Sequence, residues 1–425
     1  MKRIALILAC ALPPAAAGDS FLLRGGAIHP VSGPAIPNGA VLVKDGRIAE
    51  VGVKVAAPKG VRVIELKGLH VYPGLIDSGT QLGLAEIASV RETSDTQDLG
   101  DFKPQLRAAV AVNPESEHLA VTRANGITAA ITSPSGGIIA GQAALLHLDG
   151  WTREDLALRP SVAMRLDYPQ IQTSSGSMGM ETRRSRTPYA ELKKRYEQQL
   201  RDLDQFFESA RRYRKAKAAG ASDFRTDLKL EAMLPVLEGK LPLLVRAVRE
   251  KTIRQAIEFA ARQKVRMILQ HGAEAWKLAP ELKAGNISVT LGPTLSLPQQ
   301  EDDPYDQPFS TPAALLKAGV KFAFCTFGPG AGANPFNLPY EAAGAVPFGL
   351  PPDEALKAVT LHAAQIWGVE SEIGSIEKGK LADLIITDGD PLEITTHVRQ
   401  MFINGRPVDL NNKHKRLYEK YRQRP

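Results

Sequence analysis

The sequence predicts an α/β fold in which one large barrel carries a small β-domain assembled from both chain ends. The 425 residues allow one large α/β barrel with an appendage, or two to three smaller domains. The middle of the chain alternates short apolar runs with amphipathic stretches, which is typical of βαβ units around a parallel sheet. Short β-like stretches occupy both ends of the chain, so we expect them to build one small sheet domain together.

The composition is that of an ordinary globular protein. Hydrophobic residues make up 44% of the chain and charged residues 23%, which excludes a disordered, collagen-like or coiled-coil protein. No apolar run reaches the roughly 18 residues that a membrane span needs, so we expect a soluble mature chain. The formal net charge of +7 invites a nucleic-acid hypothesis, which the distribution of the charges must support.

Residues 1–17 resemble a secretory signal peptide. Lys2 and Arg3 give a positive start, residues 4–12 are apolar, and small residues follow at 15–18. We therefore expect export to the periplasm. An alternative is a lipoprotein anchor at Cys10; if Cys10 instead leaves with the peptide, Cys325 has no intramolecular partner and no disulfide is expected.

The ends of the mature chain have strand patterns. Residues 18–70 contain alternating apolar stretches, and Asp45-Gly46 between two of them indicates a hairpin turn. Residues 371–410 have the same character. We expect these two parts to form one β-sandwich, followed by a basic tail at 411–425.

Residues 71–370 should form the barrel. Amphipathic helices are expected at 250–262 and 353–367. Because seven candidate strands are one short of a closed barrel, the eighth is expected in 142–148, or else the barrel is irregular. The candidate strands are 71–76, 127–132, 161–166, 242–246, 265–270, 287–291 and 320–325.

A long basic helix is expected near 189–219. Between Arg183 and Lys217 there are twelve Lys and Arg against five Asp and Glu, with apolar residues at steps of three and four. We interpret it as a solvated helix whose apolar stripe packs on the barrel. Nucleic acid is not expected as a partner, because no aromatic residues interleave the basic face and no known module is present. Contact with anionic lipid or an acidic partner is the open alternative, and a membrane contact is not favoured.

The run VYPGLIDSGTQ at 71–81 resembles the amidohydrolase superfamily, in particular its imidazolonepropionase-like branch. Further matches follow in order, at Asn125-Gly126, at His271-Gly272 and in the closing GSIEKGKLADLIITDGDPLE. The resemblance implies a metal-dependent (β/α)8 TIM-like barrel with a β-sandwich. It also implies hydrolysis of non-peptide carbon–nitrogen bonds in cyclic amides, N-acyl amino acids or dipeptide-like amides.

The family's metal site is not expected to form in this chain. The resemblance implies an HxH pair after the first strand, one histidine after each of the fifth and sixth, and an aspartate after the eighth. These residues hold a divalent ion such as zinc, which activates water. Only His271 keeps a ligand-type residue, so we expect no metal cofactor. The other positions carry Gly79, Gln81, Arg246 and Phe327.

An anion-binding pocket at the barrel mouth is the alternative hypothesis. A guanidinium at a strand end inside the mouth needs a carboxylate neighbour or an anionic ligand. Glycine-rich loops at strand ends can cradle anions, although plain loop flexibility is the favoured explanation of them. The candidate pocket residues are Gln81, Arg246, His271, Thr326, Gly328 and Gly330.

Three functions therefore stay open. The first is an active exported hydrolase, and the second is a degenerate, pseudoenzyme barrel that binds a small anionic ligand. The third is a structural partner that pairs with itself or with an intact paralogue through the helix near 189–219.

Overall fold

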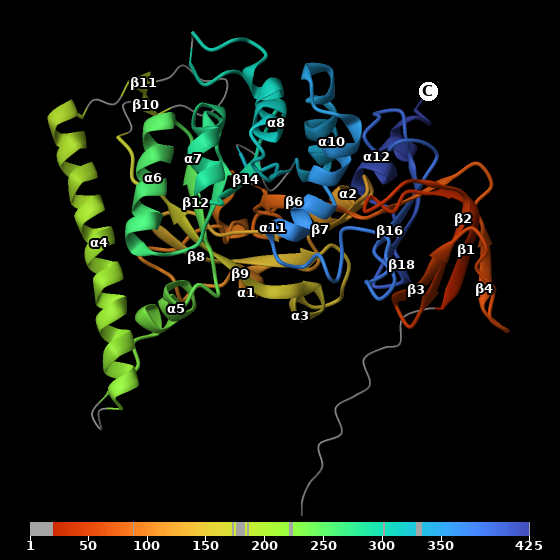
Figure 1. Cartoon of the computed structure of the whole chain (residues 1–425), viewed down its shortest axis with the longest axis horizontal. Helices are drawn as coiled ribbons and strands as arrows, with labels where there is room; N and C mark the ends of the chain where they lie inside the picture. Colours follow the sequence, from red (N-terminus) through yellow and green to blue (C-terminus); the bar gives the residue numbers. More distant parts are fainter. Residues whose placement is uncertain are drawn as a thin grey trace, which may run out of the picture.

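The computed structural model describes residues 20–87, 89–171, 187–220, 224–300, 302–328 and 334–424, together with the backbone of 174–175 and 183–184. The expected signal peptide at 1–17, with Cys10, and the candidate Gly330 lie outside the described residues. Within them the chain forms two eight-stranded sheets, one from the middle of the chain and one from both ends (Figure 1). No described helix is both long and apolar enough to cross a membrane.

The middle sheet curls into a barrel in the strand order β15-β14-β13-β12-β9-β8-β7-β6. Its inner strands are apolar and buried, as expected for a sheet covered on both faces. The expected strand at 71–76 is divided, because β5 (His70–Pro73) joins the terminal sheet and only β6 enters the barrel. The barrel strands are β6 (Leu75–Thr80), β7 (Ile127–Thr132), β8 (Ile139–His147), β9 (Ala157–Asp167), β12 (Leu243–Ala247), β13 (Met267–His271), β14 (Ser288–Leu291) and β15 (Phe322–Phe324).

The eighth strand expected in 142–148 is β8, and it makes the barrel irregular. It pairs antiparallel with both β7 and β9, whereas the other neighbouring barrel strands pair parallel. Gly136 and Gly137 have φ angles of 80° and 73°, which turn the chain back directly after β7. The glycine-rich stretch is thus a tight turn that leads into a strand.

Side chains close the gap between the first and last barrel strands. The Thr326 amide and hydroxyl, just after β15, both donate hydrogen bonds to the Asp77 carboxylate on β6. A Cβ placed on Gly79 would lie 3.2 Å from Cys325 Cβ, so the two chain segments are in close contact. Cys325 is itself fully buried, as expected of a core residue.

Helices cover the outside of the barrel. The helix expected at 250–262 is α6, but the one expected at 353–367 is two helices, α10 and α11. Thr360 separates them, because its φ and ψ of −138° and −96° are not helical. The helices are α1 (Ala108–Ala111), α2 (Glu117–Arg123), α3 (Arg153–Leu156), α4 (Tyr189–Ala219), α5 (Leu228–Leu237), α6 (Glu250–Gln263), α7 (Ala279–Ala284), α8 (Gln307–Lys317), α9 (Leu338–Ala343), α10 (Pro352–Ala358), α11 (Leu361–Ile366) and α12 (Lys413–Tyr421).

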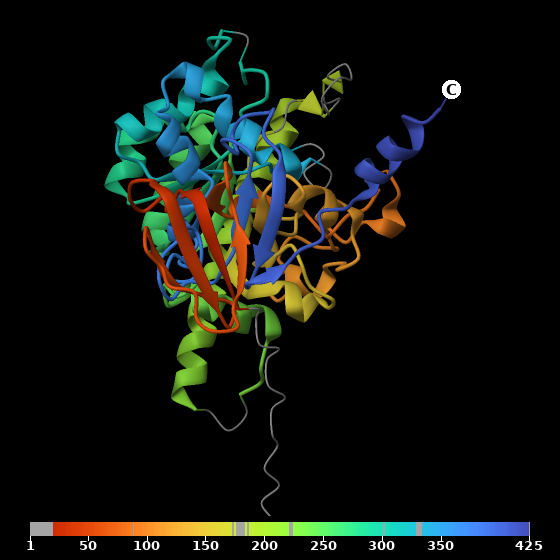
Figure 2. The same cartoon turned by 90° about the vertical axis from the view of Figure 1, so that its right-hand side faces the viewer.

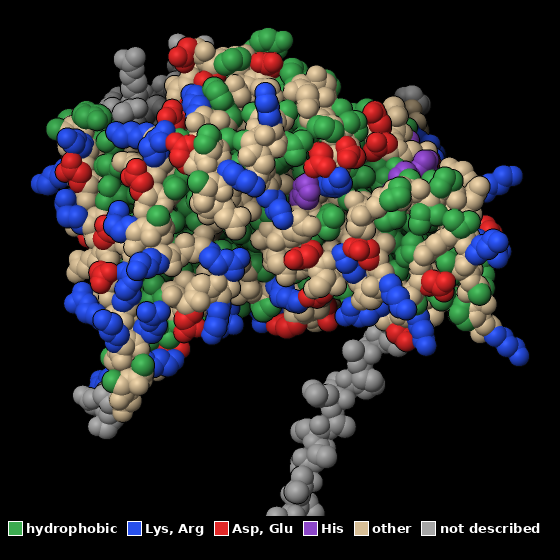
Figure 3. All heavy atoms as spheres, in the orientation of Figure 1, with side chains coloured by type: hydrophobic (Ala, Val, Ile, Leu, Met, Phe, Trp, Pro, Cys, Tyr) green, Lys and Arg blue, Asp and Glu red, His purple; other side chains and the backbone are tan. Residues whose placement is uncertain are grey.

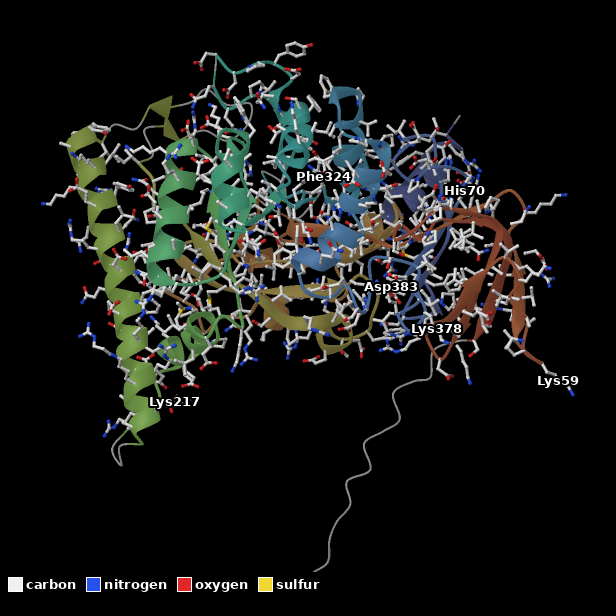
Figure 4. All side chains as sticks on the ribbon, in the orientation of Figure 1. Lys59, His70, Lys217, Phe324, Lys378 and Asp383 are labelled. Carbon is white, nitrogen blue, oxygen red and sulfur yellow. The ribbon has the colours of Figure 1, made fainter. Side chains whose placement is uncertain are left out.

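The basic helix α4 has the expected bounds and packs its apolar stripe inward. Leu203, Phe207 and Ala210 are fully buried. The helix runs along the left of the barrel and extends past its lower edge, where Figure 4 labels Lys217 (Figures 1 and 4). Lys and Arg side chains gather over its outer face (Figure 3). This confirms the interpretation of a solvated helix on the barrel.

The terminal sheet joins both ends of the chain, as expected. Figure 2 shows the first strands beside the last ones. Its order is β18-β17-β16-β5-β1-β2-β3, with β4 on β1, and the Asp45-Gly46 hairpin lies between β2 and β3. The strands are β1 (Phe21–Ile28), β2 (Ile36–Lys44), β3 (Arg47–Gly52), β4 (Arg62–Glu65), β5, β16 (Leu384–Thr387), β17 (Val398–Ile403) and β18 (Arg406–Pro407); a separate short pair is β10 (Ser174–Ser175) and β11 (Arg183–Arg184).

Candidate functional site

Arg165 forms the polar centre of the barrel. Its side chain on β9 is fully buried and donates to Asp167 Oδ1 from Nε at 3.0 Å and from Nη2 at 2.8 Å. Nη1 donates to Gln270 Oε1 on β13 and approaches Ser133 Oγ at 3.5 Å. The guanidinium also lies over the Phe327 ring, 4.5 Å from its centroid. One cation thus joins the ends of four barrel strands.

Arg246 lies beside this network and faces a cavity. On β12 it is the neighbour of both Asp167 and Gln270 in the strand register. Burial lowers the pKa of Arg246, the Asp167 charge raises it, and Arg165 lowers it further. Its Nε is inaccessible to solvent and has no hydrogen-bond partner, and no ion pair joins it to another described residue.

The cavity at Arg246 has a volume of about 350 Å³ and opens between the barrel mouth and α4. Its walls combine apolar and hydrogen-bonding groups. They are Gly137, Ile138, Asp167, Tyr168, Pro169, Gln170, Leu192, Arg195, Tyr196, Gln199, Arg246, Ala247 and Val248.

Lys103 adds a further positive charge near Asp167. It is 3% exposed, and its Nζ donates to the Asp98 carbonyl at 2.6 Å. Burial lowers the pKa of Lys103, whereas Asp98, Asp101 and Asp167 raise it. Asp167 therefore lies within the electrostatic reach of Arg165, Arg246 and Lys103.

His271 faces away from this cavity. It lines a small separate cavity of about 30 Å³ beneath the segment from Leu291 to Thr311. Burial, together with the charges of Arg246 and Arg165, lowers its pKa to about 4, against a hydrogen bond with the Phe327 backbone that raises it. Its Nδ1 is buried without a partner, so the ring is neutral at pH 7.

The remaining candidates are spread around the mouth. Gln81 Nε2 donates to Ser135 Oγ at 3.0 Å, and Thr326 is engaged with Asp77. Gly328 lies against the Pro293 ring. The structure thus places Arg246 and His271 on adjacent strands but in two different cavities, with neither Gln81 nor Thr326 lining either one.

These residues do not fit a divalent metal ion. At Gly79 there is no ligand atom, and the Gln270 amide fills the space, since an added Cβ would lie 2.5 Å from its Nε2. Arg246 is a cation, and Phe327 packs on another cation, Arg165. Across the described residues, no three His, Cys, Asp or Glu side chains converge as a metal-binding group.

Comparison with known proteins places the barrel in a family. The model of the amidohydrolase family matches residues 244–410. An imidazolonepropionase of Symbiobacterium thermophilum is 25% identical over 404 residues, covering 83% of this chain and 84% of the relative. The solved amidohydrolase of Thermotoga maritima superimposes with a TM-score of 0.80 at 25% identity, covering 92% of this chain and 99% of that one. The chain belongs to the amidohydrolase superfamily.

Another relative is much longer than this amidohydrolase-superfamily chain. The amidohydrolase tasK of Hapsidospora irregularis is 24% identical over 416 residues, which cover 89% of this chain. The chain spans only 41% of the length of that relative. The family usually uses a divalent metal.

Sequence reasoning missed the central pair. Arg165 and Asp167 stand two residues apart in the buried, otherwise apolar second half of β9, so both side chains point to the same face. Two opposite charges at this spacing in a buried strand could have indicated the pair from the sequence. Lys103 and Gln270 carry no comparable signal, because their roles arise only when distant segments meet.

Proposed function

We propose that this amidohydrolase-superfamily protein binds a small anionic ligand at its barrel mouth without a metal ion. The observation that carries the proposal is Arg246, whose buried Nε has no partner while its side chain lines a cavity of about 350 Å³. A buried donor without a partner is costly, and an anion that accepts hydrogen bonds from the guanidinium offsets that cost. A carboxylate or phosphate matches the fork of a guanidinium.

The hydrogen bonding around the cavity supports an anion. Asp167 Oδ1 already accepts two hydrogen bonds from Arg165, whereas the Nε of Arg246 has no hydrogen-bond partner. Lys103 brings a third cation to the same carboxylate. Asp98 and Asp101 also face Lys103, so Arg246 is the cation whose unpartnered nitrogen a ligand carboxylate would engage.

The cavity walls indicate the rest of the ligand. Tyr168, Leu192 and Tyr196 supply apolar and aromatic surface, while Gln170 and Gln199 offer amide groups. A cavity of this volume, with a few polar groups among apolar ones, suits a small molecule. We expect a carboxylate attached to a compact apolar or amide-containing body, such as an N-acyl amino acid. Export directed by residues 1–17 would place this binding in the periplasm.

Hydrolysis is the activity that the family suggests, and the residues argue against it here. A metal-activated water requires ligands that four of the five expected positions lack. His271 cannot replace them, because its Nδ1 is buried and the ring faces a cavity too small for a substrate. Binding without turnover is the function that this geometry supports best.

Calorimetry with defined probes tests the proposal. The probes are succinate, inorganic phosphate and a series of N-acetyl-L-amino acids, titrated into the purified chain. For the best probe, Arg246→Met should weaken binding by roughly 10- to 100-fold, the loss expected for hydrogen bonds to a charged group. Arg246→Lys should retain part of the affinity.

The matched control is Arg254→Met on α6, since Arg254 is exposed and paired with Glu250 and Glu281 on the outer surface. It should leave binding unchanged. The proposal fails if no anionic probe binds, or if Arg246→Met binds as tightly as the wild type. Turnover of any N-acetyl amino acid would restore the hydrolase hypothesis.

A further inference from the structure

The barrel interior contains a charged side chain that the proposed ligand site does not use. Arg165 is fully buried and heads the fully buried side chains by volume. It does not line the cavity at Arg246. Burying a guanidinium is unfavourable unless charge and hydrogen bonds compensate for it, so its position calls for an explanation of its own.

Arg165 is fully engaged by groups from the strand ends. Asp167 accepts from two of its nitrogens, and Gln270 Oε1 accepts from the third. Ser133 and the Phe327 ring complete the surroundings. The partners come from β9 and β13 and from the segments after β7 and β15, so one cation links strands that lie far apart in the sequence.

The same surroundings coincide with the positions where relatives would hold their metal. Gln270 fills the space that opens at Gly79, and it directly precedes His271. Phe327 stacks on the guanidinium itself. Arg246 is the register neighbour of both Gln270 and Asp167. Arg165 therefore contacts Gln270 and Phe327 directly. Gln270 in turn lies against Gly79 and beside Arg246.

We infer that the Arg165 guanidinium takes the structural place of the divalent ion, as a covalently attached cation that holds the barrel strand ends together. A metal ion joins strand ends by attracting ligands from each of them. Arg165 does this with hydrogen bonds to neutral and anionic acceptors. The substitutions fit this exchange, because an amide and an aromatic ring suit a planar guanidinium better than a compact divalent ion.

Two consequences distinguish this inference from simple loss of a metal site. The fold should be indifferent to chelators and to added metal, since its central cation is part of the chain. The charge at the centre should matter for stability, and not only the volume of the side chain, since Asp167 and Gln270 would otherwise lose the donors that Arg165 supplies.

Thermal unfolding of the purified chain tests both consequences. With excess EDTA, or with zinc chloride after its removal, the Tm of the wild type should move by less than about 1 °C. Elemental analysis should find far less than one equivalent of zinc, iron or manganese per chain. Arg165→Met keeps the volume and removes the charge, and it should lower the Tm by about 5 °C. Arg159→Met, at the exposed end of the same strand, is the control and should shift the Tm much less.

Chemical rescue separates charge from packing. Methylguanidinium at millimolar concentration should raise the Tm of Arg165→Ala and not that of Arg159→Ala, because only the former leaves a space shaped for a guanidinium. The inference is overturned if the wild type binds a stoichiometric metal that stabilises it, or if Arg165→Met is as stable as the wild type. If the Arg165 variants do not fold, the metal measurements on the wild type still decide. Neither result depends on whether an anion binds at Arg246.

Discussion

Asp77 and Thr326 close the barrel through a buried hydrogen-bonded pair. The Thr326 hydroxyl donates to Asp77 Oδ2 at 2.6 Å, and its backbone amide donates to Oδ1 at 3.2 Å. The Gly79 amide donates to the same Oδ1 at 3.0 Å. Burial nevertheless dominates and raises the pKa of Asp77 to about 7, against the hydrogen bonds from Thr326 and Gly79. The first and last strands thus meet at a carboxyl group that titrates near neutrality.

Asp77→Asn should therefore change the pH dependence of stability. Because the pKa of Asp77 is higher in the folded chain than in the unfolded chain, the folded state binds more protons between pH 4 and pH 7, and wild-type stability falls as the pH rises through that range. The asparagine does not titrate. In urea unfolding, the free energy of unfolding of the variant relative to that of the wild type should therefore rise by roughly 4 kcal/mol between pH 4 and pH 8.

The control for this experiment is Gly33→Ala, which removes no ionisable group, so its stability difference from the wild type should stay flat over the same range. A flat difference for Asp77→Asn as well would mean that the carboxyl is ionised throughout, and that the hydrogen bonds outweigh burial.

A second prediction concerns the contact between the barrel and the terminal sheet, where Figure 4 labels Asp383. His147 Nε2 on β8 lies 2.9 Å from Asp383 Oδ2, and the Asn404 side-chain amide lies 3.1 Å from His147 Nδ1. Both ionisable side chains are almost fully buried. His147→Ala leaves the buried Asp383 carboxylate short of a donor, which should cost about 3–5 kcal/mol in urea unfolding.

The comparison variant for this pair is His118→Ala. His118 also makes one hydrogen bond, to the Glu86 carbonyl at 2.8 Å, but it lies half-buried on the surface helix α2. The variant His118→Ala should lower the free energy of unfolding by about 1 kcal/mol. Equal losses for the two variants would show that the His147 contact is no more than an ordinary surface hydrogen bond.

Packing of α4 gives the third prediction. Phe207 is fully buried and meets the Phe259 ring edge-on, with centroids 5.2 Å apart. Phe207→Ala should lower the free energy of unfolding by about 3–5 kcal/mol, as for other buried aromatic truncations. Lys194→Ala on the outer face should change it by less than about 0.5 kcal/mol. Comparable effects would mean that the charged face, rather than the apolar stripe, attaches the helix.

Local patterns predicted most elements of this fold, and the exceptions have physical causes. The expected strand at 127–132 and the helix at 189–219 match the structure because their apolar periodicity is unbroken. The direction of β8 depends on the positive φ angles of two glycines, which do not reveal which way the next strand runs. The break at Thr360 has no proline or glycine to mark it, so periodicity alone extended the helix across it.

The loss of metal ligands could be predicted from the sequence, but the hydrogen-bond network around Arg165 could not. The losses can be read directly from the sequence, because Gly79 and Phe327 stand at positions where the family motif is expected to have metal ligands. The hydrogen-bond network around Arg165 depends on contacts between residues that are far apart in the sequence. Arg165 and Gln270, for example, are 105 residues apart. Arg246 at a strand end was visible because a charge there is unusual. That it lines a different cavity from His271 follows from side-chain directions, which the sequence does not specify.

The last prediction concerns Gly79, one of the two positions of the HxH pair that the family resemblance implies. A Cβ there would lie 2.5 Å from Gln270 Nε2 and 3.2 Å from Cys325 Cβ, so Gly79→Ala should lose about 1–3 kcal/mol in urea unfolding. Gln270→Ala should also be destabilising, because Arg165 loses an acceptor. The double variant should be more stable than the sum of the two losses predicts, by about 1–2 kcal/mol, since the second truncation makes room for the methyl group.

Gly33→Ala, where nothing lies within 4 Å of the added Cβ, is the control and should be nearly neutral. Strict additivity at Gly79 and Gln270 would show that the glutamine amide moves aside freely, and that it does not block the position that a metal ligand would need.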